Sequence, residues 1–111
     1  MDFTSRKLDN IEIITVEADR IDAAVAIQFK DRMREQLTGA SGRVILDLHE
    51  VAFIDSSGLG AIVAVMKLMP QGAKLELAGL TASVDKVFRM TRMDSIFSIH
   101  ADAQSAAASH V

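Results

Sequence analysis

The stretch RVILDLHEVAFIDSSGLGAIVAVMKLM, residues 43–69, decides how the rest of this sequence is interpreted. Its opening residues, Val44–Leu48, are apolar except for Asp47, which is typical of a central strand covered on both faces. After a short connection, the segment Asp55–Gly60 (DSSGLG) opens a helix. Backbone N–H groups at a helix N-terminus are unpaired and the helix dipole is positive there, so this corner can hold a negative group.

Strands and helices alternate on both sides of this stretch. Runs of β-branched or alternating apolar residues predict four further strands, over Phe3–Lys7, Ile11–Val16, Lys74–Ala78 and Ile96–Ile99. Helical spacing predicts helices over Ala23–Leu37, capped by Asp22, from Ser57 to Met69, and from a cap at Thr81 or Ser83 onward, with Val84, Val87 and Phe88 facing inward and Met90 as a further candidate. The Ala/Ser-rich tail, residues 101–111, is expected to be a weak helix or frayed.

This order predicts a single α/β domain over residues 1–111, built on a mixed, mostly parallel sheet of four to five strands with three to four helices. An antiparallel pair is expected at the amino end. In such sheets the loops that carry functional residues lie at the carboxyl ends of the strands. Residues 19–22, 49–57 and 79–83 fall there, so the functional site is expected among them.

Composition limits the classes of function. The 111 residues carry a net charge of −3 and no cysteine, tryptophan or tyrosine, which excludes disulfides and thiolate chemistry. No basic cluster with aromatic neighbours is present, so nucleic-acid binding is disfavoured. The longest uncharged run is too short to cross a bilayer, and no secretory signal opens the sequence. We expect a cytoplasmic protein with a protein partner.

Signatures of catalysis are missing from the sequence. His49, His100 and His110 lack the spacing of a metal site. Gly58 and Gly60 lack the third glycine of a dinucleotide fingerprint, and no Gly-Lys-Ser/Thr phosphate loop occurs. The serine corner lacks the Gly-x-Ser-x-Gly elbow of a hydrolase and an evident base. We therefore expect a chain without a catalytic site, metal or cofactor of its own.

Two interpretations of the serine corner stay open on the residues alone. In the first, one serine caps the helix, Asp55 favours its positive end and the glycines allow a tight turn. In the second, Ser56 accepts a phosphate, which adds about −1.5 to −2 charges and three acceptor oxygens. The helix N-terminus would tolerate this charge, while Asp55 and Asp22 would add repulsion at an interface built over the corner.

The segments Val44–Leu48 and Val51–Gly60 resemble the signature of STAS-domain anti-sigma factor antagonists. The resemblance extends from about Ile11 to Ile99 and includes Ile21-Asp22 before the first helix and Gly79-Leu80 before the third. It implies a single STAS-like domain that regulates other proteins by switching partners.

The resemblance also implies roles for individual residues. Ser56 would be phosphorylated by an ATP-dependent anti-sigma serine kinase of the histidine-kinase-like fold. The unphosphorylated chain would bind that kinase and free its target, and a metal-dependent serine phosphatase would reset the switch. ATP and magnesium would belong to the kinase. Ser57 would be a cap rather than an acceptor, and the expected partner-binding set is Asp22, Asp55, Ser57, Gly58 and Leu59.

Two other functions remain as alternatives. The chain could be a STAS binding subunit of a transporter or of a larger signalling assembly, never phosphorylated, with Asp55 and Ser56 kept only as turn residues. It could also be a small hydrolase or nucleotide-binding enzyme that uses Ser56 or Ser57, although a base and a phosphate loop are missing. Two positions depart from the family pattern, because Asp19 and Arg92 stand where glycine is usual; both could alter the choice of partner.

Overall fold

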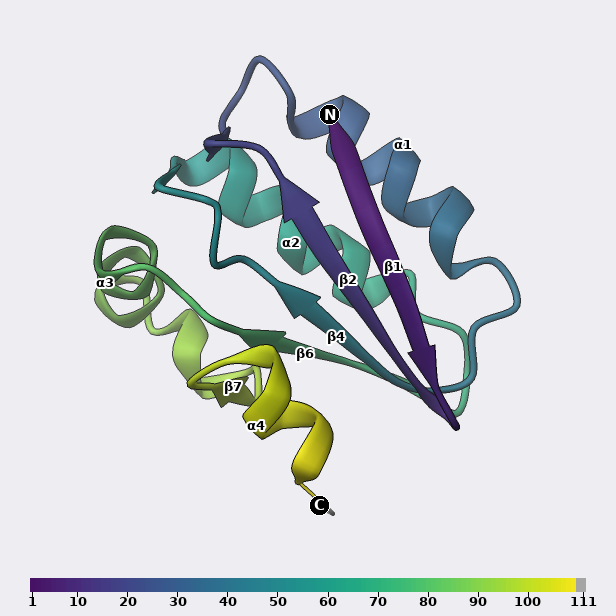
Figure 1. Ribbon diagram of the computed structural model, residues 1–111. Coiled ribbons are helices and arrows are strands. Elements are labelled where there is room, and N and C mark those ends of the chain that lie inside the picture. Colours follow the sequence, from purple (N-terminus) through teal and green to yellow (C-terminus); the bar gives the residue numbers. More distant parts are fainter. Residues whose placement is uncertain (110–111) are drawn as a thin grey trace.

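A five-stranded mixed sheet forms the centre of the computed structural model, which describes residues 1–109 (Figure 1). Its strand order is β1-β2-β4-β6-β7. The β1–β2 pair is antiparallel and the other pairs are parallel, as the sequence predicts. The strands span Asp2–Leu8 (β1), Ile11–Glu17 (β2), Gly42–Asp47 (β4), Ala73–Ala78 (β6) and Ile99–His100 (β7).

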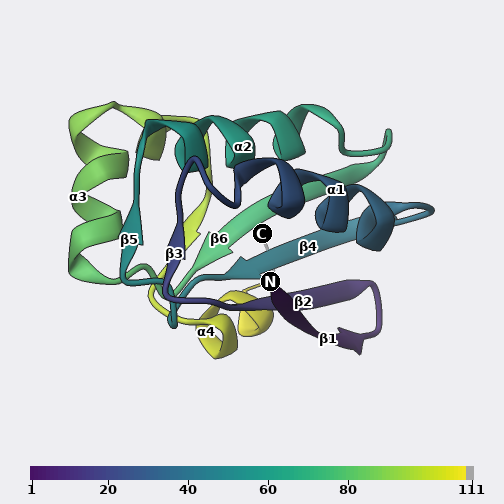
Figure 2. The same ribbon diagram turned by 90° about the horizontal axis from the view of Figure 1, so that it is seen from above.

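The helices cover the two faces of the sheet unequally. Helices α1 (Ala26–Leu37) and α2 (Ser56–Lys67) lie side by side on one face, and the short α4 (Ala103–Ala108) covers part of the other (Figure 2). Helix α3 (Ala82–Met90) stands at the end of the layer and is followed by a 3₁₀ turn, Met93–Ser95. The predicted fold class, α/β with a mixed, mostly parallel sheet of four to five strands and three to four helices, is confirmed for the described residues.

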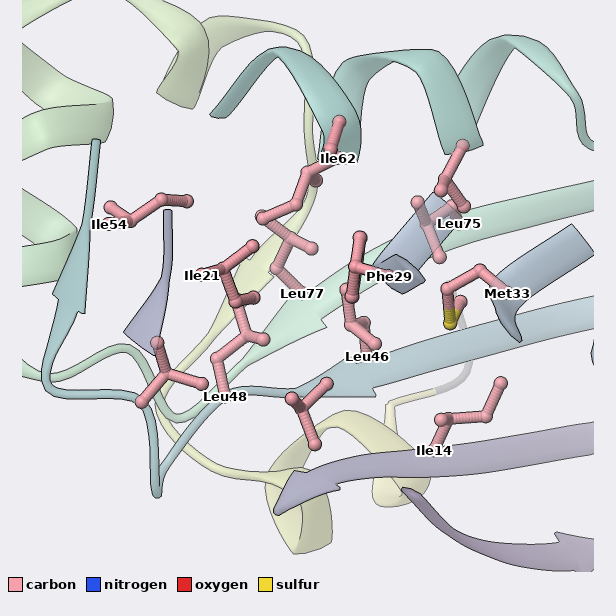
Figure 3. Packing of buried hydrophobic residues seen from close by; sticks show 14 of the residues in the cluster. Ile14, Ile21, Phe29, Met33, Leu46, Leu48, Ile54, Ile62, Leu75 and Leu77 are labelled. Atoms are coloured by element: carbon pink, nitrogen blue, oxygen red, sulfur yellow. The ribbon is translucent and has the colours of Figure 1, made fainter. Parts of the chain in front are cut away.

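The main core lies between the sheet and helices α1 and α2. Phe29 and Met33 of α1 and Ile62 of α2 point toward Leu46 and Leu77 of the sheet, and all five are fully buried (Figure 3). Burying a side chain of this size stabilises the fold by roughly 1.5–3 kcal/mol. This core fixes α2, and with it the serine corner, onto the centre of the sheet.

The central strand β4 is covered on both faces, as its apolar sequence predicts. Val44 and Leu46 belong to the main core, whereas Ile45 points to the opposite face and packs with Ile13 and Ala106 of α4. A helix therefore does form in the predicted weak or frayed tail, over 103–108, and it completes the burial of the strand. Residues 110–111 lie outside the described part of the chain.

A second, two-stranded parallel sheet was not predicted. It pairs β3 (Arg20–Ile21) with β5 (Phe53–Ile54). Two-residue strands show no periodicity, so the sequence pattern contains no signal for them. The pairing continues where the Asp19 carbonyl accepts hydrogen bonds from the N–H groups of Ala52 at 2.7 Å and Phe53 at 3.1 Å. This small sheet brings the loop that carries Asp22 beside the start of α2.

Several details of the elements differ from the prediction. The first helix begins at Ala26 and not at Ala23, because residues 23–25 form a separate turn. The last strand is Ile99–His100 and not Ile96–Ile99, because the 3₁₀ turn delays the return of the chain to the sheet. Met90 does not face inward: it is 74% exposed at the end of α3, whereas Val84 and Phe88 are buried as predicted.

The start of the third helix also differs in detail. Thr81 occupies its N-cap position, as predicted, but makes no side-chain capping bond. The Thr81 hydroxyl instead donates a hydrogen bond to the Val51 carbonyl at 2.9 Å. This bond joins the loop after β6 to the loop after β4 and steadies the segment that leads to the serine corner.

Candidate functional site

Asp55, and not a serine, caps helix α2. Its backbone is extended and its Oδ1 accepts a hydrogen bond from the N–H of Gly58 at 2.9 Å. The prediction that a serine, more precisely Ser57, provides the cap is therefore wrong. A carboxylate at the N-cap satisfies the same unpaired N–H and adds a charge that favours the positive helix end. The cap leaves both serine hydroxyls available for other roles.

Ser56 and Ser57 are the first two residues of α2, and both are exposed. Within residues 1–109 neither hydroxyl makes a hydrogen bond to another side chain or to a backbone carbonyl. Ser56 follows the cap directly, so its side chain leaves the helix beside the N–H groups of the first turn. The geometry thus presents a free hydroxyl at the positive end of a helix.

The same aspartate joins two segments of the chain. Asp55 Oδ2 accepts a hydrogen bond from the N–H of Ala23 at 3.1 Å. The Gly58 and Ala23 N–H groups, in that order of weight, hold the pKa of Asp55 below its ordinary range, so its carboxylate is ionised at neutral pH. The corner therefore carries a permanent negative charge next to Ser56.

Asp22 lies on the loop that Asp55 holds. It does not cap α1; its Oδ1 accepts a hydrogen bond from the N–H of Ala24 at 3.1 Å and caps the turn that precedes the helix. Its other oxygen pairs with Arg20 at 3.3 Å. The structure therefore places the predicted acidic neighbours Asp22 and Asp55 on two adjoining loops, which the hydrogen bond from Ala23 to Asp55 joins.

Gly58 and Leu59 have structural positions under this corner. A Cβ on Gly58 would run into the backbone carbonyl of Ile21, so only glycine lets α2 approach β3 this closely. Leu59 is 8% exposed and belongs to the main core. Their role in partner binding stays a prediction. Since both residues are buried, they would act by positioning Ser56 and Ser57 and not by contacting the partner.

The two departures from the family pattern have different surroundings. Arg92 has φ 61°, in the left-handed region that favours glycine, which explains why a glycine is usual there. Asp19 contributes to the β3–β5 pairing only through its backbone carbonyl, which any residue could supply. The effect of either on the choice of partner stays a prediction.

His49 and His100 pair with carboxylates and make no hydrogen bond to Ser56 or Ser57. His49 contacts Asp47 through Nδ1 at 3.0 Å, and His100 contacts Glu76 through Nε2 at 2.7 Å. Among residues 1–109, no three His, Cys, Asp or Glu side chains come close enough together to hold a metal ion. His110 lies outside these residues. In the same part of the chain, no helix has both the length and the apolar character that a membrane crossing requires.

Comparison with known proteins identifies the family. The family model described as STAS domain matches residues 2–106. The anti-sigma-B factor antagonist of Listeria monocytogenes is 30% identical over 100 residues, which are 89% of this chain and 86% of that protein. The chain therefore belongs to the STAS-domain family of anti-sigma factor antagonists, a class of regulatory binding proteins rather than enzymes.

Solved structures show the same fold at lower sequence identity. An anti-sigma factor antagonist from Mycobacterium paratuberculosis superposes with a TM-score of 0.85 at 16% identity, over 96% of this chain and 90% of that one. The Bacillus cell fate determinant SpoIIAA in its phosphorylated form gives a TM-score of 0.66 at 19% identity, over 96% of both chains. These likenesses concern the fold alone.

Proposed function

We propose that this chain is an anti-sigma factor antagonist controlled by phosphorylation of Ser56. The unphosphorylated chain binds an anti-sigma serine kinase and releases that kinase's target, and the phosphate ends the binding. The observation that carries the proposal is the exposed Ser56 hydroxyl at the start of α2, where Asp55 already provides the cap. A phosphate on Ser56 would therefore not remove the capping interaction that the fold needs.

Electrostatics supports a switch at this position. A phosphate brings about −1.5 to −2 charges to a helix N-terminus, where N–H groups and the dipole offset them within the fold. At the surface the added charge lies beside the carboxylates of Asp55 and Asp22 on the adjoining loops. The modified chain stays folded, while a partner surface that suited the unmodified corner meets repulsion.

The relatives support the same assignment. The Listeria relative is described as an anti-sigma-B factor antagonist, and SpoIIAA has been solved in both its unphosphorylated and its phosphorylated form. In this proposal the kinase supplies ATP and magnesium, a serine phosphatase resets the chain, and the circuit operates in the cytoplasm to regulate transcription. The chain itself contributes a binding surface and an acceptor hydroxyl.

A second candidate is a STAS module that works by binding alone. The fold supports it, because a segment of the murine anion transporter SLC26A9 superposes with a TM-score of 0.79 at 15% identity, over 92% of this chain and 18% of that one. In that case Ser56 is never modified. The two candidates differ in one measurable property, the phosphorylation of Ser56.

The experiment incubates the purified chain with each purified anti-sigma serine kinase of its own genome, with ATP and magnesium, and maps phosphate by mass spectrometry. We expect a single phosphate on Ser56, lost in Ser56→Ala and kept in the matched control Ser57→Ala. A chain left unmodified by every kinase would overturn the proposal in favour of the binding module, and a phosphate on Ser57 instead would overturn the assignment of Ser56 as the acceptor.

A further inference from the structure

A groove runs between the first turns of α1 and α2, directly beside the serine corner. Its cavity volume is about 250 Å³, and it is lined by Ala26, Ile27, Lys30, Ser57, Gly60 and Ala61. Ser57 belongs both to the groove and to the corner, so a partner that covers Ser56 also reaches the groove. Its floor is made of small residues, which leaves room for a side chain from outside.

Gly60 is not required by the fold. Its φ lies outside the left-handed region, and a Cβ added there would meet nothing within 4 Å. Glycine inside a helix is unfavourable compared with alanine, because it loses more backbone freedom on folding. Gly58, two residues earlier, has a steric reason to be glycine. At Gly60 the only space that the missing side chain preserves is that of the groove.

The walls of the groove supply an apolar and a charged contact. Ile27 is 70% exposed and gives the groove an accessible apolar wall. Lys30, one turn further along α1, makes no ion pair with any side chain of residues 1–109. An exposed apolar side chain next to an unpaired cation suits a partner that offers an apolar side chain with a carboxylate beside it.

We propose that the groove receives an apolar side chain of the anti-sigma kinase and that a neighbouring carboxylate of the kinase pairs with Lys30. This inference rests on the proposed function and deepens it, because it names the docking site and its chemistry. Gly60 sets which side chain fits. A phosphate on Ser56, which adjoins the Ser57 wall of the groove, would repel that carboxylate.

The test measures the Kd of the purified kinase for four variants: Gly60→Ala, Ile27→Ala, Lys30→Glu and the control Leu8→Ala. Leu8 is also an exposed apolar residue, but it lies at the β1–β2 turn, at the opposite end of the molecule from the start of α2 (Figure 1). We expect the three groove variants to bind about tenfold more weakly or worse and Leu8→Ala to bind as the wild type does. The Gly60→Ala variant is expected to keep or raise its Tm, so its loss of binding would not reflect unfolding.

Failure of the inference and failure of the proposed function give different results. If the wild type binds a kinase and Gly60→Ala and Ile27→Ala bind equally well, the groove is overturned and the proposed function stands. If the wild type binds no kinase, both are overturned. Fluorescence gives a second measurement. Because the chain has no cysteine of its own, a single introduced cysteine can be labelled with a fluorophore. A label on Ile27→Cys should change its emission when the kinase binds, and a label on Leu8→Cys should not.

Discussion

The Asp55 carboxylate accepts a hydrogen bond from the N–H of Ala23 at 3.1 Å, although 32 positions separate the two residues in the sequence. Its other oxygen accepts the N–H of Gly58 at 2.9 Å. One side chain therefore joins the loop that carries Asp22 to the helix that begins with Ser56. The geometry of the serine corner depends on this double contact.

Removal of the Asp55 carboxylate should destabilise the fold. We expect Asp55→Ala to lower Tm by about 4–8 °C, because α2 loses its cap and the loop loses its tether. Asp55→Asn should lower Tm less, because its single amide oxygen can keep only one of the two contacts. Thermal unfolding followed by circular dichroism measures both variants, and an unchanged Tm for Asp55→Ala would contradict the account.

The two glycines of α2 should respond oppositely to alanine. Gly58→Ala places a Cβ against the Ile21 carbonyl and is expected to lower the free energy of unfolding by about 1–3 kcal/mol. Gly60→Ala meets open space and is expected to raise it by about 0.5–1 kcal/mol. Urea denaturation compares them directly, and a loss of stability in Gly60→Ala would show that the fold does need this glycine.

A buried ion pair under α4 should make stability depend on pH. Arg43 donates to both carboxylate oxygens of Glu76, at 2.6 and 2.7 Å, and also to the carbonyls of Ala106 and Ser109 in the last turn of α4 and just beyond it. The Arg43 guanidinium, and then His100, hold the pKa of Glu76 below its ordinary value of 4.5. The paired carboxylate therefore stabilises the fold above pH 4.5, and this contribution is lost as the pH falls through the lowered pKa.

The matching variant is Glu76→Gln. At pH 7 it should lose about 3 kcal/mol of stability, because Arg43 is left partly buried without its partner. Urea midpoints between pH 7 and pH 3 should fall less steeply below pH 4.5 in Glu76→Gln than in the wild type. Parallel curves for the two proteins would show that Glu76 does not carry this dependence.

The left-handed backbone at Arg92 should make glycine favourable there. With φ 61°, an arginine costs roughly 1–2 kcal/mol that glycine avoids. We expect Arg92→Gly to raise the free energy of unfolding by about 1 kcal/mol. The control Lys86→Gly, in the exposed middle of α3, should lower it by about the same amount. A loss of stability in both variants would contradict the assignment.

Apolar patterning predicted most of this fold, because strands of five or more residues and helices of three turns leave a clear periodicity. The buried strand β4 and the alternating β6 are examples. The β3–β5 pair and the Asp55 tether left no such pattern, since each depends on a few residues that only the tertiary fold brings together. The serine cap was predicted wrongly because Asp55 and the two serines are all good N-cap residues, and only the observed dihedral angles distinguish them.

The affinity of the purified anti-sigma kinase for unmodified, phosphorylated and substituted forms of this chain tests the central claim most directly. We expect the unmodified chain and Ser56→Ala to bind with similar Kd. The chain phosphorylated on Ser56 and the Ser56→Asp variant should keep the circular dichroism of the wild type and bind at least about tenfold more weakly. Equal affinity of the unmodified and phosphorylated chains for the kinase would contradict the claim that Ser56 is the switch.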